Sequence, residues 1–235
     1  MTLFTHRNPE MQLEMERTGL VLVDMQNEFL SEIGGYYQMI ADRLESEHVH
    51  DHLEQLLISA KASGIHVLHS PHYFYPTDGQ WVAPAGAMAD YLGGIGFCLR
   101  KDALSLEDFA GSRADFPDRY RKYLQDGQTA NTSPHKYYSS EANDLVLQLR
   151  MRRIDKVIMA GPVGNLCLEG HMRDLIDRGF EVAMVRDAVA GAVNDEGDGY
   201  EAAMTNYRFM ANAVWTTEET VKRIDALTSP PSHPR

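Results

Sequence analysis

The chain has 235 residues, 43% of them hydrophobic, and a formal net charge of −12, as expected for an ordinary globular protein with one large domain or two small ones. The negative charge disfavours nucleic acid and anionic membranes as partners, because both require a basic contact surface. No apolar run is long enough to span a membrane, and the N-terminus lacks the pattern of a secretion signal. The two cysteines, Cys98 and Cys167, are too few for a disulfide scaffold, so we expect a reducing, cytoplasmic location.

Apolar runs alternate with amphipathic segments in the N-terminal half. Residues 19–24 (GLVLVD) have the pattern of a strand that is buried on both faces. Residues 48–64 are predicted to form an amphipathic helix that ends at Gly64, and residues 65–70 the next strand. The connection over 71–135 is rich in proline, glycine and aromatic residues, and we interpret it as a functional insertion rather than a linker.

The C-terminal half repeats this alternation. The pattern predicts strands over 155–161 and 180–188, and helices over 139–153, 166–179 and 199–213. Strands that alternate with helices indicate an α/β fold, with a parallel sheet covered on both faces. Since no shift in composition marks a boundary, we expect one domain over 1–225 and a disordered tail over 226–235.

Chemically capable side chains follow the predicted strands. Ligands of open parallel sheets bind beyond the carboxyl ends of the strands. Asp24 ends the first strand, where it would either cap the next turn or act as a carboxylate base. His69, Ser70 and His72 lie at the end of the second strand.

Cys167 lies in the stretch AGPVGNLCLEG, just after the strand over 155–161. A free cysteine is commonly a small core residue, but the first turn of a predicted helix would favour a thiolate nucleophile. The stretch has neither the glycine spacing of a dinucleotide site nor the lysine of a phosphate-binding loop. His171 could share a helix face with Cys167, but two ligands do not make a metal site, so packing or surface exposure is the simpler interpretation.

Three segments together resemble a known family. GLVLVDMQNEFL, followed by HKYYSS and then VIMAGPVGNLCLEG, resembles the isochorismatase-like cysteine hydrolases, which include nicotinamidases, ureidoacrylate amidohydrolases and carbamoylsarcosine amidases. The resemblance covers residues 18–215 and is weakest over 71–130. It implies a three-layer, Rossmann-like fold with a six-stranded, mostly parallel sheet and helices on both faces.

The resemblance also implies a catalytic triad of Asp24, Lys136 and Cys167. Asp24 would take the thiol proton, and Lys136 would hold Asp24. A non-proline cis peptide between Pro162 and Val163 would aim the N–H groups of Val163 and Cys167 at the developing oxyanion.

Phe29 and Trp81 match places where nicotinamidases put aromatic rings against a flat substrate, with core packing as the alternative for both. Tyr137, beside Lys136, is a further candidate for substrate binding. Nicotinamidases carry an Asp-x-His metal motif after the second strand. Here Ser70 stands in the aspartate position and only His72 is retained. We therefore expect no metal and no cofactor, with His69 and His72 as loop or pocket residues.

The function expected from this resemblance is metal-independent cleavage of a C–N bond in a small amide, ureide or carbamoyl compound through a thioester. The partners would be this small molecule and further copies of the chain, in a dimer or tetramer. Two alternatives remain: vinyl-ether cleavage of the isochorismatase type, and a catalytically silent binding or scaffold protein. Cys167 disfavours the first, and the intact set of Asp24, Lys136 and Cys167 disfavours the second.

Overall fold

A parallel sheet forms the centre of the molecule. The computed structural model describes residues 11–82 and 86–228. The sheet has six strands in the order β3-β2-β1-β4-β5-β8, and every neighbouring pair is parallel. In chain order the strands are β1 (Thr18–Val23), β2 (His66–Ser70), β3 (Ala130–Asn131), β4 (Lys156–Ala160), β5 (Glu181–Val185) and β8 (Ala213–Trp215). The six-stranded parallel sheet expected from the sequence is therefore confirmed.

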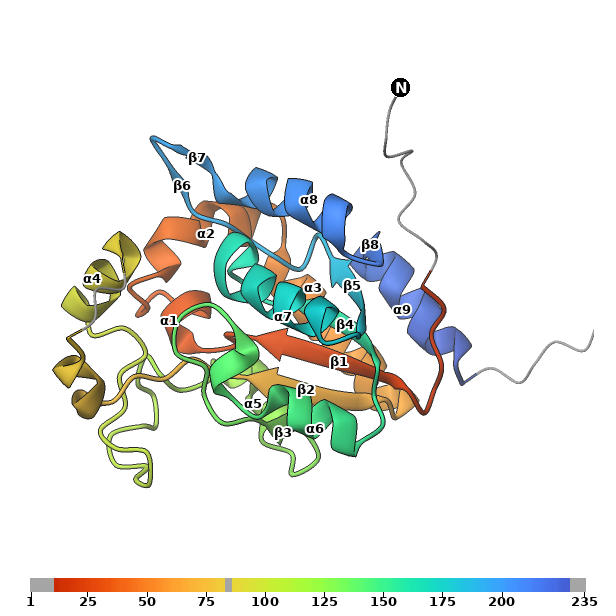
Figure 1. The fold of residues 1–235 in the computed structure, drawn as a ribbon, viewed down its shortest axis with the longest axis horizontal. Helices are drawn as coiled ribbons and strands as arrows, with labels where there is room; N and C mark the ends of the chain where they lie inside the picture. The colour runs from red at the N-terminus through yellow and green to blue at the C-terminus, as the bar shows by residue number, and fades with distance from the viewer. Residues whose placement is uncertain (1–10, 83–85, 229–235) are drawn as a thin grey trace, which may run out of the picture.

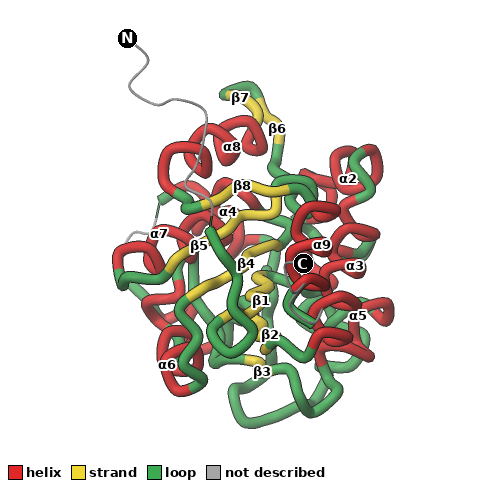
Figure 2. Tube along the Cα trace, turned by 90° about the vertical axis from the view of Figure 1, so that its right-hand side faces the viewer, coloured by secondary structure: helices red, strands yellow, loops and turns green. Residues whose placement is uncertain are grey.

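Helices cover both faces of this sheet, as the tube in Figure 2 shows. One face carries α2 (Tyr37–Ser46), α3 (Val49–Ser63), α5 (Asp118–Leu124) and α9 (Thr217–Ala226). The other carries α6 (Leu145–Met151), α7 (Glu169–Asp177) and α8 (Gly199–Met210). The fold is thus a three-layer α/β arrangement.

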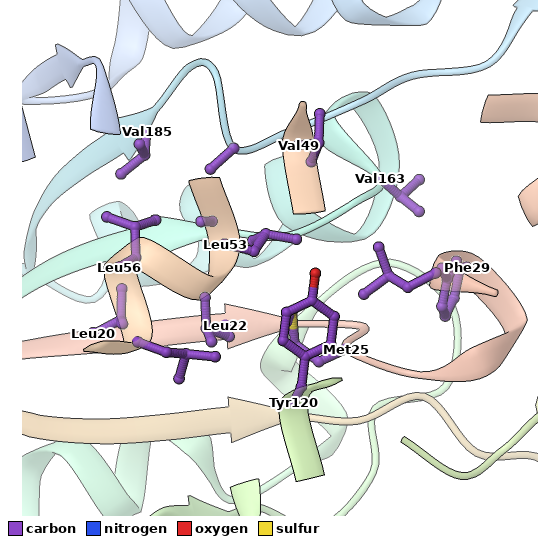
Figure 3. Packing of buried hydrophobic residues seen from close by; sticks show 14 of the residues in the cluster. Leu20, Leu22, Met25, Phe29, Val49, Leu53, Leu56, Tyr120, Val163 and Val185 are labelled. Carbon is purple, nitrogen blue, oxygen red and sulfur yellow. The ribbon is translucent and has the colours of Figure 1, made fainter. Parts of the chain in front are cut away.

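The strand β1 shows why the sequence folds this way. All six of its residues are buried, and successive side chains alternate between the two faces of the sheet. Leu20 and Leu22 belong to the core cluster on one side, while Val21 and Val23 belong to the cluster on the other. Figure 3 shows Leu20 and Leu22 in the cluster that includes Leu53 and Leu56 of α3.

Two predicted helices differ from the observed ones. The helix predicted over 139–153 is a short 3₁₀ turn, Ser140–Ala142, followed by α6, because Asn143 between them is fully extended. The helix predicted over 166–179 begins as a π-helical turn, Gly164–Leu168, and continues as α7. Cys167 therefore precedes the α-helix rather than lying in its first turn.

Short elements complete the described chain. They are α1 (Asn27–Leu30), the 3₁₀ turn Pro76–Gln80, α4 (Ala87–Gly94), and the two-stranded ribbon of β6 (Val193–Asn194) and β7 (Gly197–Asp198). In the ribbon view, α1 and α4 lie beyond the carboxyl ends of the central strands (Figure 1). Of the tail expected over 226–235, residues 229–235 lie outside the described residues. Within the described ranges, no helix is long and apolar enough to cross a membrane.

Candidate active site

The site lies where β1, β2 and β4 end side by side. Asp24 follows β1 directly and has a left-handed backbone, φ 62°, which costs strain in most residues but is tolerated by aspartate. Its N–H donates to the Ser70 carbonyl across 3.1 Å. The carboxylate is 1% exposed, and its Oδ1 accepts a hydrogen bond of 2.9 Å from Nε2 of His135.

His135 bridges two segments of the chain. It pairs with His72 in a parallel β-bridge, and its backbone N–H donates to the Pro71 carbonyl across 3.0 Å. Nδ1 of its ring lies 3.2 Å from the Tyr137 carbonyl oxygen, while Nε2 contacts Asp24. A carbonyl and a carboxylate are both acceptors, so this arrangement satisfies an imidazolium ring with two N–H donors. The cationic partner of Asp24 is therefore His135.

Lys136 does not make the contact with Asp24 that the sequence led us to expect. Its Nζ donates to the Tyr73 carbonyl across 2.9 Å, forms an ion pair with Asp78, and lies 4.2 Å from the ring centroid of Tyr75. Neighbouring side chains point to opposite sides of an extended segment. Since His135 faces inward from its bridge, Lys136 faces the other way.

Cys167 lies against this Asp24–His135 pair. Cys167 is only 5% exposed, and its Sγ lies 3.4 Å from the Tyr137 carbonyl oxygen. One donor atom from each of Asp24, His72, His135 and Cys167 falls within 4.8 Å of the other three. These four side chains, hereafter the buried quartet, are also the residues that could hold a metal ion.

The two reactive groups have opposite electrostatic environments. Burial raises the pKa of Asp24, but the charge and hydrogen bond of His135, together with His72, outweigh burial and hold that pKa below its usual value. Burial, followed by the charge of Asp24, raises the pKa of the Cys167 thiol well above its usual value. The resting site is thus a carboxylate beside a protonated thiol. The expectation that the helix start would favour a thiolate is wrong, because Cys167 precedes α7 and is buried next to an anion.

The turn before Cys167 is held by backbone contacts to a neighbouring loop. Gly164 N–H donates to the Ala190 carbonyl across 2.8 Å, and Ala190 N–H donates to the Pro162 carbonyl across 3.2 Å. The expected cis bond between Pro162 and Val163 is not observed, because none of the described residues has a cis peptide. Gly161 lies opposite β1, where an added Cβ would come within 2.4 Å of the Val23 carbonyl oxygen.

A cavity of about 430 Å³ opens beside the buried quartet. Its walls include Phe74, Trp81, Phe97 and Tyr137. The ring centroids of Phe74 and Phe97 lie 5.1 Å and 4.9 Å from the ring centroid of His72. The cavity is held open by pairing of two segments, because Phe74 N–H donates to the Cys98 carbonyl and Arg100 N–H donates to the Phe74 carbonyl. An aromatic chamber thus lies against the His72 side of the buried quartet.

The substrate-binding residues predicted from the sequence lie in two different places. Trp81 and Tyr137 line the cavity, with ring centroids 6.0 Å apart. Phe29 is only 1% exposed and packs edge-on against Phe97 at 5.2 Å, so it supports a cavity wall from behind. Core packing, the alternative interpretation, describes the observed place of Phe29.

The remaining histidines differ in their partners. His69 accepts from the Met25 N–H and contacts Asn131, and His171 contacts the Ser70 hydroxyl and the Cys167 carbonyl, so both rings are fully engaged. His72 is different, because neither ring nitrogen has a hydrogen-bond partner among the described residues, although the residue is 1% exposed. The sequence indicated His72 only as a loop or pocket residue and did not point to His135. The one available signal for His135 was its position beside Lys136.

The fold and the buried quartet define a class: an α/β protein with a protonated thiol and a carboxylate at the carboxyl edge of a parallel sheet. The Isochorismatase domain family matches residues 114–219, which include His135 and Cys167. This match confirms the resemblance to isochorismatase-like hydrolases noted from the sequence.

Many known proteins are similar to the chain, and three of them represent the range. Ureidoacrylate amidohydrolase RutB from Acinetobacter baylyi is 26% identical over 169 residues, which make up 69% of this chain and 66% of that protein. A cysteine hydrolase from Pseudomonas syringae has a similar structure, with a TM-score of 0.76 and 22% identity over 95% of this chain and 100% of the other. N-carbamoylsarcosine amidase from Thermoplasma acidophilum has a TM-score of 0.60 and 18% identity, over 86% of this chain and 97% of the other. The two structural likenesses establish the fold.

Proposed function

We propose that the chain is a cysteine hydrolase that cleaves the C–N bond of a small amide, ureide or carbamoyl compound through a thioester. The main support is one arrangement: the Asp24 carboxylate contacts the ring of His135, and donor atoms of Asp24 and Cys167 lie within 4.8 Å of each other. The names of the similar proteins, an amidohydrolase and an amidase, point to the same bond type.

Asp24, rather than His135, is the general base in this proposal. Both ring nitrogens of His135 are directed at other acceptors, the Asp24 carboxylate and the Tyr137 carbonyl. By contrast, Oδ2 of Asp24 has no hydrogen-bond partner among the described residues, so its lone pairs are available to the thiol proton. His135 keeps the carboxylate ionised and fixes its orientation, which is the part that the resemblance had suggested for Lys136.

Acylation begins when Asp24 accepts the Cys167 proton as Sγ attacks the substrate carbonyl carbon. The carbonyl oxygen becomes an oxyanion, for which the N–H group of Cys167 is the proposed donor. The part expected of the Val163 N–H rested on the cis bond that is not observed, so Val163 is left out of this proposal. The C–N bond then breaks, and the leaving nitrogen takes the proton from Asp24. The products of this half-reaction are an amine or ammonia and a thioester on Cys167.

Deacylation uses the same carboxylate. Asp24 takes a proton from a water molecule as that water attacks the thioester carbonyl. The C–S bond breaks, the sulfur regains the proton from Asp24, and the acid leaves. Each group returns to its starting protonation state, so the cycle consumes only water and substrate.

The aromatic chamber indicates where the rest of the substrate lies. Trp81, Tyr137 and Phe74 present ring faces and edges to the cavity of about 430 Å³, which suits a small substrate with a flat or apolar portion. We place the substrate's approach to the buried thiol on this side, since the Tyr137 carbonyl contacts Sγ while the Tyr137 ring lines the cavity.

Acid-quenched mass spectrometry tests the proposal. The protein is mixed with a panel of small amides, ureides and carbamoyl compounds, and both ammonia release and the mass of the Cys167 peptide are followed. Release of ammonia with an acyl adduct on Cys167 is the expected result, and both signals should vanish in Cys167→Ala but persist in the control Cys98→Ala. Turnover that survives in Cys167→Ala would favour vinyl-ether cleavage, and a complete lack of turnover would favour the silent binding protein.

A further inference from the structure

The buried quartet contains one side chain that the hydrolytic cycle does not use. His72 is 1% exposed, and both nitrogens of its ring lack a hydrogen-bond partner among the described residues. Leaving a buried polar atom without a partner costs about 1–3 kcal/mol, so such a group calls for an explanation. One ring nitrogen of His72 lies within 4.8 Å of the donor atoms of Asp24, His135 and Cys167.

We propose that the buried quartet is a binding site for a thiophilic divalent cation of the Zn²⁺ type, and that such a cation inhibits the enzyme by occupying Cys167. The ligands would be one carboxylate oxygen of Asp24, one ring nitrogen each of His72 and His135, and Sγ of Cys167. The binding itself depends only on these four side chains. The inhibition rests on the proposed function.

The donor set matches the coordination chemistry of zinc. Zinc in proteins is bound tetrahedrally by cysteine sulfur, histidine nitrogen and carboxylate oxygen at about 2.0–2.3 Å. Ligand atoms around such an ion lie roughly 3.3–3.8 Å apart. The four donor atoms now lie within 4.8 Å of one another, so side-chain movements of about 1 Å would bring them to that spacing.

The charges of the bound state also balance. Binding requires that Cys167 lose its thiol proton and that Nε2 of His135 lose its proton, and both protons leave to solvent. A thiolate, a carboxylate and two neutral imidazoles then surround a dication, so a site that is almost fully buried carries no net charge.

The surroundings of His135 support this role. A histidine that binds a metal usually donates its other ring N–H to a carbonyl or carboxylate, which orients the ring. Nδ1 of His135 lies 3.2 Å from the Tyr137 carbonyl oxygen, while Nε2 faces Asp24 and the interior of the buried quartet. This supporting contact is in place before any cation arrives.

Cobalt is the probe for the experiment, because a thiolate bound to Co²⁺ gives a near-ultraviolet charge-transfer band that needs no enzymatic turnover. The full-length protein is titrated with Co²⁺, and then with Zn²⁺ in competition. We expect one equivalent to bind, with a thiolate band that Zn²⁺ displaces. The band should be lost in Cys167→Ala and kept in Cys98→Ala, the matched control for the other buried cysteine.

His72→Phe separates the proposed site from adventitious binding by a thiol. Phenylalanine fits among the neighbouring rings of Phe74 and Phe97 but removes both nitrogens. We expect the affinity for Co²⁺ to fall by more than about 100-fold, since even the loss of a residue that only supports a ligand costs roughly 10–100-fold. Circular dichroism of each variant confirms that the fold is kept, and Asp24→Asn serves as a second ligand variant if His72→Phe does not fold.

Three outcomes would overturn the proposal: no thiolate band, a band that depends on Cys98, or an affinity unchanged by the loss of His72. Zn²⁺ that raises amide turnover instead of lowering it would overturn the inhibitory part. If no amide is cleaved but the band behaves as expected, the cation site stands and the proposed hydrolase function fails. The two proposals can therefore fail independently.

Discussion

Nε2 of His135 lies 2.9 Å from Oδ1 of Asp24, although 111 positions separate the two residues in the chain. Both side chains are almost completely buried, with side-chain exposures of 0% and 1%. The neighbouring Lys136 is directed to Asp78 instead. This relationship assigns the cationic partner of the carboxylate to a histidine and generates the first prediction.

His135→Gln should lower kcat/KM by about 100-fold, or about 2.7 kcal/mol, near the upper value for a hydrogen bond to a charged group. His135→Lys should retain more activity than His135→Gln, because it keeps a positive charge near Asp24. Lys136→Met should cost about tenfold or less, since it breaks the contacts with Asp78, Tyr73 and Tyr75 but none with Asp24. Steady-state kinetics on the amide that is cleaved fastest provides the measurement. A larger loss of kcat/KM in Lys136→Met than in His135→Gln would contradict the assignment of His135 as the partner of Asp24.

Alkylation of Cys167 should be slow at neutral pH, because burial and the Asp24 charge raise the pKa of its thiol. Asp24→Asn removes that charge, so it should speed alkylation by iodoacetamide at a given pH while turnover is lost. The measurement uses the Cys98→Ala background, in which Cys167 is the one remaining cysteine. Slower alkylation in Asp24→Asn would mean that Asp24 activates the thiol in the resting state.

The acidic limb of the pH–activity profile should lie below pH 3.8, the ordinary pKa of an aspartate. The catalytic form of Asp24 is the ionised one, and its pKa is lowered in the folded protein, so kcat/KM falls only as the pH drops through this lowered value. The same shift stabilises the fold above the unfolded pKa and is lost as the pH falls through the folded pKa. Circular dichroism at each pH distinguishes loss of the base from unfolding, and an acidic limb near neutrality in a folded protein would argue against Asp24.

Phe29→Ala and Trp81→Ala should affect different quantities. Phe29 is 1% exposed, so its truncation should lower the free energy of unfolding by about 3–5 kcal/mol. Trp81 is 48% exposed and lines the cavity, so its truncation should raise KM with little change in stability. Denaturant unfolding and steady-state kinetics on both variants provide the check. An unchanged KM in Trp81→Ala would remove that residue from the substrate site.

Gly161→Ala should destabilise the protein by more than about 2 kcal/mol, because the new Cβ would lie 2.4 Å from the Val23 carbonyl oxygen and φ is 157°. Gly93→Ala is the matched control, since nothing lies within 4 Å of the Cβ it would add and its backbone is helical. Thermal unfolding of the two variants should separate them clearly. Equal stability would show that the turn and β1 are not held as closely as described.

The sequence revealed the parts of the fold that depend on burial periodicity. The strand over 19–24 and the helix over 48–64 are found almost at their predicted bounds, as β1 and α3. β3 and β8 were not predicted, because strands of two and three residues are too short to show a period. The π-helical turn at Cys167 also has no sequence pattern of its own, so the sequence predicted residues 166–168 as the start of an α-helix.

The site was predictable where a residue directly follows a strand and less so where it depends on tertiary pairing. Asp24 and Cys167 follow strands, and both were identified. The inward position of His135 depends on its bridge to His72, a residue 63 positions earlier in the chain. A shift of one residue in such an extended segment exchanges which side chain faces the site. The choice between His135 and Lys136 could therefore be made only with coordinates.

Most of the cavity wall comes from a single stretch of chain within residues 74–99, and among the described residues Tyr137 is the one contributor from elsewhere. The reacting groups, by contrast, are carried by the ends of the central strands and the segment around His135. Under the proposed function, ligand choice and bond cleavage would thus be encoded in separable portions of the polypeptide. A chimera that exchanges only this stretch for its counterpart from a related hydrolase offers a route to new substrates without rebuilding the chemistry.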